Sequence, residues 1–197
     1  VAVPSLTVIL FYHLQIQGYL FGQSQESIHE TLAPYSFLQL SGDTIRSKEL
    51  EGKVVWMSFY SSKCGACARE LPHVAAVADK FKGNPKVDFL AVNSIHFESF
   101  EKFRDSKVFH SFGLKTAYEY EDNLGGQFAP TGVPVGILVD QNGVAVFKKD
   151  GFRPSDKRFF EDWLTEEINA LLDKGSQTGY SPCSLPQFEY HAMLSHK

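Results

Sequence analysis

Apolar and polar positions follow one another in a pattern that divides this chain into short strands and amphipathic helices. Five short apolar runs are predicted to be strands, at residues 33–40, 54–60, 87–92, 135–140 and 144–148. Three longer segments with apolar residues at helical spacing are predicted to be helices, at residues 66–81, 98–112 and 155–172. Residues 23–30 are polar and are predicted to be a linker, and residues 115–131 lack a clear period and are predicted to be mostly loop.

From the run at residues 54–60 onward, the order of these elements is strand, helix, strand, helix, strand, strand, helix, which predicts an α/β fold. The runs at residues 54–60 and 87–92 are almost continuously apolar, as expected of parallel strands that are buried on both faces. Asn142 and Gly143 lie between the last two runs and are a strong signal for a tight antiparallel turn. We therefore expect a sandwich in which helices flank a mixed central sheet.

The ends of the chain are expected to lie outside the main domain. That domain is predicted over residues 33–173, with an N-terminal extension over residues 1–32 and an irregular C-terminal tail over residues 174–197. Residues 6–14 have the length of the apolar part of a signal peptide, but His13 interrupts them and no basic residue precedes them. A remnant of a targeting segment and an added strand or helix both fit this stretch. On the first interpretation the domain works outside the cytoplasm, periplasmic or secreted, with a membrane tether at its N-terminus.

Charge and cysteine usage narrow the function classes. The formal net charge is −4 and no run of basic residues occurs, so we expect no nucleic-acid partner. Three cysteines are too few for a disulfide scaffold. The closely spaced Cys64 and Cys67 are therefore the informative pair, and Cys183 is left over.

Cys64 and Cys67 lie where a predicted buried strand ends and a predicted helix begins. A helix N-terminus favours an anion through its unpaired N–H groups and its dipole, and Lys63 and Arg69 add positive charge. Cys64 is therefore predicted to be the nucleophile with a lowered pKa, and Cys67, one turn later, to attack the mixed disulfide. A zinc site is disfavoured because structural zinc needs four ligands, and only Cys183 and scattered histidines remain. We expect neither a metal nor an organic cofactor.

Two motifs resemble the thioredoxin superfamily, and more closely its extracytoplasmic TlpA/ResA-type branch. They are FYSSKCGACARELP at residues 59–72 and GVPVGILVDQNGVAVF at residues 132–147. The resemblance covers residues 33–173 and implies a thioredoxin-like sandwich. It also implies a cis peptide between Val133 and Pro134 that lies against the cysteine pair, with the backbone of Val133 binding the substrate chain.

The resemblance implies further roles, and the sequence also departs from the family. Glu70 matches an acid of the TlpA/ResA branch and is predicted to shuttle a proton; the alternative is a solvated carboxylate that offsets the helix dipole. Gly65 and Ala66 occupy the positions that tune the redox potential in the family, where a proline is common at the second. Lys63 replaces the usual tryptophan. Ser58 replaces the buried acid of thioredoxin, which removes one proton acceptor.

These features predict an enzyme, a thiol–disulfide oxidoreductase. Its first cysteine attacks a protein disulfide and its second resolves the intermediate, or the reverse occurs with a protein dithiol, and an upstream reductant or oxidant protein restores the pair. Two alternatives stay open: a thioredoxin-fold peroxidase, and a metal or haem-maturation chaperone with His96 and His110 as additional copper ligands. His73 is expected to be a surface or boundary residue without a catalytic role.

Overall fold

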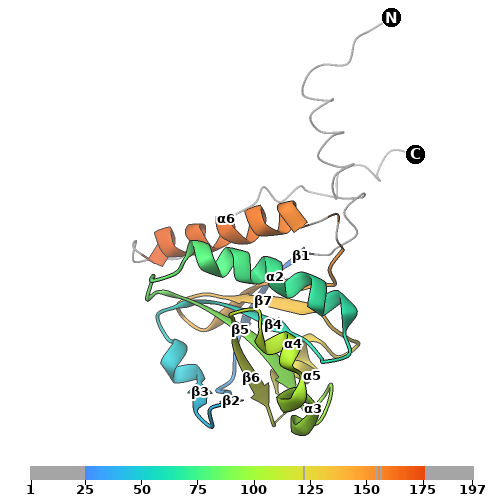
Figure 1. The fold of residues 1–197 in the computed structure, drawn as a ribbon. Coiled ribbons are helices and arrows are strands. Elements are labelled where there is room, and N and C mark those ends of the chain that lie inside the picture. The colour runs from blue at the N-terminus through green and yellow to red at the C-terminus, as the bar shows by residue number, and fades with distance from the viewer. Residues whose placement is uncertain (1–24, 122, 154, 156, 176–197) are drawn as a thin grey trace, which may run out of the picture.

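A mixed sheet of eight strands lies at the centre of the part of the chain described by the computed structural model, which comprises residues 25–121, 123–153, 155 and 157–175. Helices cover both faces of this sheet (Figure 1). The strands are β1 (Gln25–Thr31), β2 (Ser36–Gln39), β3 (Thr44–Arg46), β4 (Val54–Phe59), β5 (Val87–Ser94), β6 (Lys115–Glu119), β7 (Val135–Val139) and β8 (Val144–Asp150). The helices are η1 (Ser47–Leu50), α2 (Gly65–Lys80), α3 (Phe100–Asp105), α4 (Lys107–His110), α5 (Leu124–Phe128) and α6 (Lys157–Gly175).

The sheet combines parallel and antiparallel pairs, as the sequence predicts. Its order is β1-β8-β7-β4-β5-β6-β2-β3. β4 pairs in parallel with β5, and β5 with β6, whereas β7 runs antiparallel to both β4 and β8. All six residues of β4 are buried, because helices cover one of its faces and a second apolar layer covers the other. The predicted fold class is therefore confirmed.

Helices α2 and α6 lie side by side on one face of the sheet (Figure 1). α2 buries Leu71, Val74 and Val77 along one side, and Val74 and Val77 pack with Trp56 and Phe160 in one cluster. Burying an aliphatic side chain of this size stabilises the folded state by about 1.5–3 kcal/mol. This packing holds α2 against β4, and so determines where the first turn of α2 lies.

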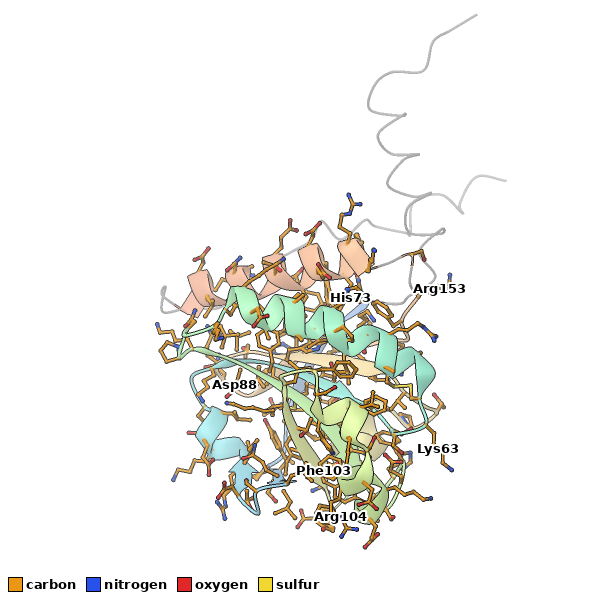
Figure 2. The ribbon with its side chains drawn as sticks, in the orientation of Figure 1. Lys63, His73, Asp88, Phe103, Arg104 and Arg153 are labelled. Atoms are coloured by element: carbon orange, nitrogen blue, oxygen red, sulfur yellow. A yellow bond between two sulfur atoms is a disulfide. The ribbon has the colours of Figure 1, made fainter. Side chains whose placement is uncertain are left out.

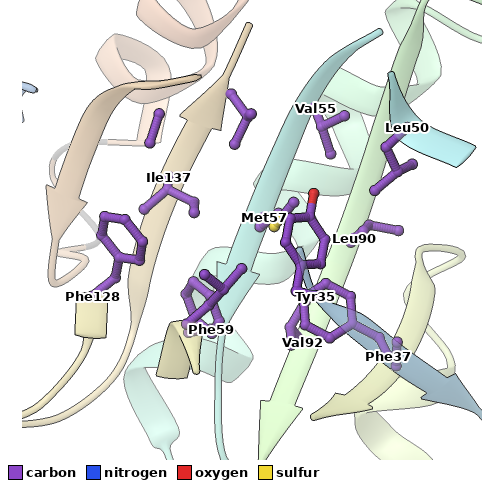
Figure 3. Close-up of a cluster of buried hydrophobic side chains, with 14 of the residues drawn as sticks. Tyr35, Phe37, Leu50, Val55, Met57, Phe59, Leu90, Val92, Phe128 and Ile137 are labelled. Atoms are coloured by element: carbon purple, nitrogen blue, oxygen red, sulfur yellow. The ribbon is translucent and has the colours of Figure 1, made fainter. Parts of the chain in front are cut away.

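The opposite face of the sheet carries a second apolar cluster, shown in Figure 3. Val55, Met57 and Phe59 point to this side from β4, because successive side chains of a strand alternate between its faces. The hairpin of β2 and β3, helix η1 and helix α5 cover the cluster, and Phe37 and Phe128 are among the side chains that they contribute. Both faces of β4 are thus shielded from solvent, and packing on both sides fixes the position of its C-terminal end.

Three segments differ from the prediction. The expected linker contains strand β1, which pairs antiparallel with β8 through a register shift between Ser27 and Glu30; its mostly exposed side chains hide the strand pattern. The expected loop over residues 115–131 contains β6 and α5, whose pairing and packing are set by distant parts of the chain. The expected helix over residues 98–112 consists of two short helices separated at Ser106. Among the described residues, no helix has the length and apolarity needed to cross a membrane.

Candidate active site

A disulfide between Cys64 and Cys67 lies at the C-terminal end of β4, with an S–S distance of 2.07 Å. Cys64 is the N-cap residue of α2, and Cys67 lies in its first turn. Cys67 is fully buried, whereas Cys64 is partly exposed. Of these two cysteines, Cys64 is therefore the one that a large substrate can approach, which fits its predicted role as the nucleophile.

The first turn of α2 presents positive electrostatic potential to the Cys64 sulfur. The Cys67 N–H donates a hydrogen bond to Cys64 Sγ at 3.0 Å, and a helix N-terminus stabilises an anion at this position. Lys63 is exposed and lies beside the beginning of α2 (Figure 2). Arg69 folds back over the motif, because its Nη1 lies 3.6 Å from the place where a Cβ at Gly65 would stand. The turn can therefore stabilise a thiolate at Cys64 in the reduced protein.

The peptide bond between Val133 and Pro134 is cis, as the resemblance implies. It directly precedes β7, which pairs with β4, so the loop lies beside the end of β4. The carbonyl oxygen of Val133 lies 3.4 Å from Cys64 Sγ, although the two residues are 69 positions apart. The two sequence motifs therefore meet at one point. Val133 is partly exposed, and its backbone stands next to the sulfur that a substrate would contact.

Glu70 is fully buried, which excludes the alternative of a solvated carboxylate. Its Oε1 accepts a hydrogen bond from Lys149 Nζ at 2.8 Å, and its Oε2 has no hydrogen-bond partner among the described residues. Burial raises the pKa of Glu70, and the Lys149 ammonium opposes this increase, with a smaller contribution from His73. Cys67 and Glu70 are three positions apart on α2 and so occupy neighbouring places on its surface. An acceptor with a free lone pair thus lies near the buried cysteine.

Lys149, the partner of Glu70, was not identified from the sequence. It is completely buried in β8, and its ammonium lies 5.3 Å and 4.9 Å from the ring centroids of Phe152 and Phe160. A signal was present: Lys148 ends the predicted strand and Lys149 follows it directly, and consecutive side chains of a strand point to opposite faces. One of the two lysines therefore had to face the interior, where a lysine needs an acid partner.

Glu98, which was not identified from the sequence either, anchors the loop that leads to Cys64. It is buried after β5, and its carboxylate accepts hydrogen bonds from the Ser62 backbone N–H at 2.7 Å, from the Ser62 hydroxyl and from the Asn93 amide. Tyr118 donates its hydroxyl proton to the Glu98 backbone carbonyl at 2.6 Å. Burial, and then the charge of Glu98, raise the pKa of Tyr60. The network fixes Ser62, two residues before the cysteine.

The remaining candidates lie in structural positions. His73 is partly buried between α2 and α6 (Figure 2), where its Nδ1 lies 2.6 Å from Glu161 Oε1, so it is the boundary residue that was expected. Both ring nitrogens of His110 contact oxygens of neighbouring residues. His96 stacks edge-on against Phe97.

No group of three or more His, Cys, Asp or Glu side chains in the described part of the chain could hold a metal ion.

Ser58 accepts a hydrogen bond from the Trp56 indole at 2.8 Å. The position that holds a buried acid in thioredoxin is therefore occupied here by a neutral hydroxyl group with a hydrogen-bond partner. Cys183 lies outside the described residues.

Comparisons with known proteins agree with this fold. The model of the AhpC/TSA family matches residues 28–148, more than half of the chain. The chain is similar to the thiol-disulfide oxidoreductase ResA of Halalkalibacterium halodurans, with 29% identity over 110 residues that cover 54% of this chain and 59% of that protein. The match thus spans less than two thirds of that relative.

Two solved structures have a similar fold. One is an exposed lipoprotein thioredoxin of Streptococcus pneumoniae, with a TM-score of 0.59, 20% identity, and coverage of 71% of this chain and all (100%) of that one. The other is a secreted disulfide oxidoreductase of Mycobacterium tuberculosis, with a TM-score of 0.53, 17% identity, and coverage of 70% and 96%. These likenesses confirm the thioredoxin-like fold that the two motifs imply.

Proposed function

This chain belongs to the AhpC/TSA family, and on that premise we propose that it is a thiol–disulfide oxidoreductase that acts on proteins. One observation carries the proposal. The accessible sulfur of a Cys64–Cys67 disulfide lies at a helix N-terminus and 3.4 Å from the carbonyl oxygen before a cis-proline. This arrangement supports a nucleophilic role for Cys64, a resolving role for Cys67 and a substrate-binding role for the backbone of Val133.

In the first step the Cys64 thiolate attacks one sulfur of a substrate disulfide. A bond forms between Cys64 and that sulfur, the substrate S–S bond breaks, and the other substrate sulfur leaves as a thiolate that takes up a proton. The backbone of Val133 stands beside the new mixed disulfide and can pair with the substrate chain. Lys63, Gly65 and Ala66 shape the exposed side of the turn and so influence how strongly the thiolate is stabilised.

In the second step the Cys67 thiol gives its proton to the carboxylate of Glu70. The Cys67 thiolate then attacks Cys64 Sγ, and the second substrate sulfur leaves as a thiolate and is protonated. The substrate has gained two electrons and two protons, and the protein holds the disulfide seen in this structure. The same steps run backwards when the oxidised protein meets a substrate dithiol.

The setting of this chemistry is proposed to be extracytoplasmic. The two similar solved structures are described as an exposed lipoprotein and as a secreted protein, and disulfide substrates persist in oxidising compartments. Each turnover leaves the Cys64–Cys67 pair in the opposite redox state. A further protein must therefore reduce or oxidise the pair before the next cycle.

An insulin reduction assay tests the proposal. We expect activity in the wild-type protein, loss of activity in Cys64→Ser, and accumulation of a mixed disulfide in Cys67→Ser, because the intermediate then lacks its resolving thiol. Cys183→Ser is the matched control and should keep full activity.

A wild-type protein that is inactive in both the reducing and the oxidising direction would refute the proposal, and peroxide consumption independent of Cys67 would favour a peroxidase. The reduction potential of the Cys64–Cys67 pair gives the direction of the reaction. A value of about −270 mV would indicate a reductant, and a value of about −120 mV would indicate an oxidant.

A further inference from the structure

Lys149 is a fully buried, charged group close to the redox centre for which the proposed steps assign no role. Its ammonium donates one hydrogen bond to Glu70 Oε1 at 2.8 Å and another to the carbonyl oxygen of Gly151. Two aromatic rings lie beside it and exclude water. A lysine is rarely placed in such surroundings unless it is paired, because the loss of hydration of an ammonium ion is costly.

The position of Lys149 connects the two halves of the candidate site. On one side its acceptor is Glu70, on the helix that carries Cys64 and Cys67. On the other side its acceptor is Gly151, whose N–H donates to the Pro134 carbonyl at 2.8 Å. The ammonium is thus fixed between the cysteine helix and the cis-proline segment.

Two charged or titratable side chains of the described residues act on the Glu70 carboxylate. Lys149 faces it from β8, and His73 faces it from α2 and is itself bound to Glu161 of α6. Phe152 and Phe160, the aromatic neighbours of the ammonium, are neutral. Among the described residues, the positive charge nearest to the Glu70 carboxylate is therefore that of Lys149. Without it, the carboxylate would be buried beside a partly exposed histidine that already has a carboxylate partner.

We propose that Lys149 is a positioning residue of the redox centre, which holds Glu70 as a carboxylate with its Oε2 free to accept the Cys67 proton. This role rests on the proposed oxidoreductase function and deepens it. The ion pair occupies Oε1 and orients the carboxyl group, while Oε2 keeps an unused lone pair in a dry environment. Burial tends to make Glu70 a stronger base, and Lys149 keeps that base unprotonated between turnovers.

The substitution Lys149→Met tests this role, because methionine keeps an unbranched side chain and removes the charge. Glu70 should then take up a proton and lose its ability to act as a base. Each unit by which its pKa exceeds the assay pH lowers the carboxylate population about tenfold. We therefore expect attack by Cys67 to slow about tenfold or more at pH 7, while attack by Cys64 stays within about twofold of wild type.

The two steps are measured separately with the full-length reduced protein and a peptide disulfide. Samples are quenched with acid, alkylated and weighed by mass spectrometry, which counts the mixed disulfide and the final Cys64–Cys67 disulfide over time. The slowing in Lys149→Met should diminish as the pH rises, because a growing fraction of Cys67 then ionises without help.

Lys148→Met is the matched control, since its Nζ forms a partly exposed ion pair with Asp150 at 3.1 Å on the opposite side of the same strand. This variant should behave as wild type in both steps.

The outcomes distinguish failure of the proposed oxidoreductase function from failure of the proposed role of Lys149. Absence of a mixed disulfide in the wild type would refute the oxidoreductase function itself. A normal mixed disulfide that Lys149→Met resolves at the wild-type rate and with the wild-type pH profile would overturn only the role of Lys149. The charge-free variant Glu70→Gln/Lys149→Met keeps the test decisive if the single variant does not fold. It should resolve as slowly as Glu70→Gln alone, and resolution at the wild-type rate would overturn the proposal.

Discussion

Removal of the Glu98 side chain is predicted to loosen the loop that holds Cys64. In Glu98→Ala three hydrogen bonds to a carboxylate are lost, two from Ser62 and one from Asn93. Ser62 is partly exposed, so water can replace its partner. Asn93 is completely buried, so its amide is left without an acceptor.

The size of the effect follows from these contacts. A buried donor without a partner costs about 1–3 kcal/mol, and a hydrogen bond to a charged group contributes about 1.5–3 kcal/mol. Because water compensates part of the loss at Ser62, we expect Glu98→Ala to lower the free energy of unfolding by about 3 kcal/mol. With a urea dependence of about 2 kcal/mol per M, the midpoint of unfolding should fall by about 1.5 M.

Two measurements on the same samples check the reasoning. Urea unfolding gives the loss of stability, and the rate of iodoacetamide alkylation of the reduced protein reports the reactivity of Cys64, which should fall as the loop loses its anchor. The control is Glu101→Ala, which removes an exposed glutamate three residues further along and should lower the urea midpoint far less than Glu98→Ala does. An unchanged midpoint in Glu98→Ala would refute the energetic argument. A lower midpoint with unchanged alkylation would show that Ser62 does not position Cys64.

Two further predictions concern the core and the alkaline pH range. Gly136→Ala should destabilise the protein by about 3 kcal/mol or more, because a Cβ there would lie 2.0 Å from Trp56 Cζ2 and 2.3 Å from Cη2. In a Trp56→Phe background, which lacks these atoms, the same change should cost clearly less; equal costs in a double-mutant cycle of urea unfolding would contradict the clash. Burial raises the pKa of Tyr118 from its ordinary 10.0 to about 12, so the folded state favours the protonated phenol. That contribution is fully present below pH 10 and is lost as the pH rises to about 12. The urea midpoint should therefore fall over this range less steeply in Tyr118→Phe than in wild type, and parallel curves would count against the assignment.

The parts of the fold that were predictable are those whose own residues carry the signal. The runs that form β4, β5, β7 and β8 are continuously apolar or are linked by a strong turn signal. The helical spacing of α2 follows from the one face that it buries. β6 and α5 were missed because their formation depends on distant contacts. β6 pairs with β5, and Leu124 and Phe128 of α5 pack into the apolar cluster that covers β4. No pattern within residues 115–131 contains that information.

In the candidate site, too, some residues carry a local sequence signal and others have roles that depend on distant contacts. Cys64, Cys67 and Pro134 lie in motifs that carry a local signal, and the structure brings them together as expected. Glu98 and Lys149 make their contacts with residues 36 and 79 positions away. Their roles come from tertiary packing, which a single sequence does not display. The consecutive lysines of β8 were the one available clue, and they were informative only in combination with the period of a strand.

The two edge strands of the sheet also influence whether molecules of this protein aggregate. An exposed strand edge is a template on which another chain can add a strand and begin aggregation. At one edge of the described sheet, β1 is interrupted by its register shift and carries the exposed Glu26 and Glu30. At the other edge, β3 is only three residues long. Neither edge of the described sheet is a long, flat, uncharged strand. Both edges therefore disfavour edge-to-edge pairing between the sheets of two molecules, even at high protein concentration.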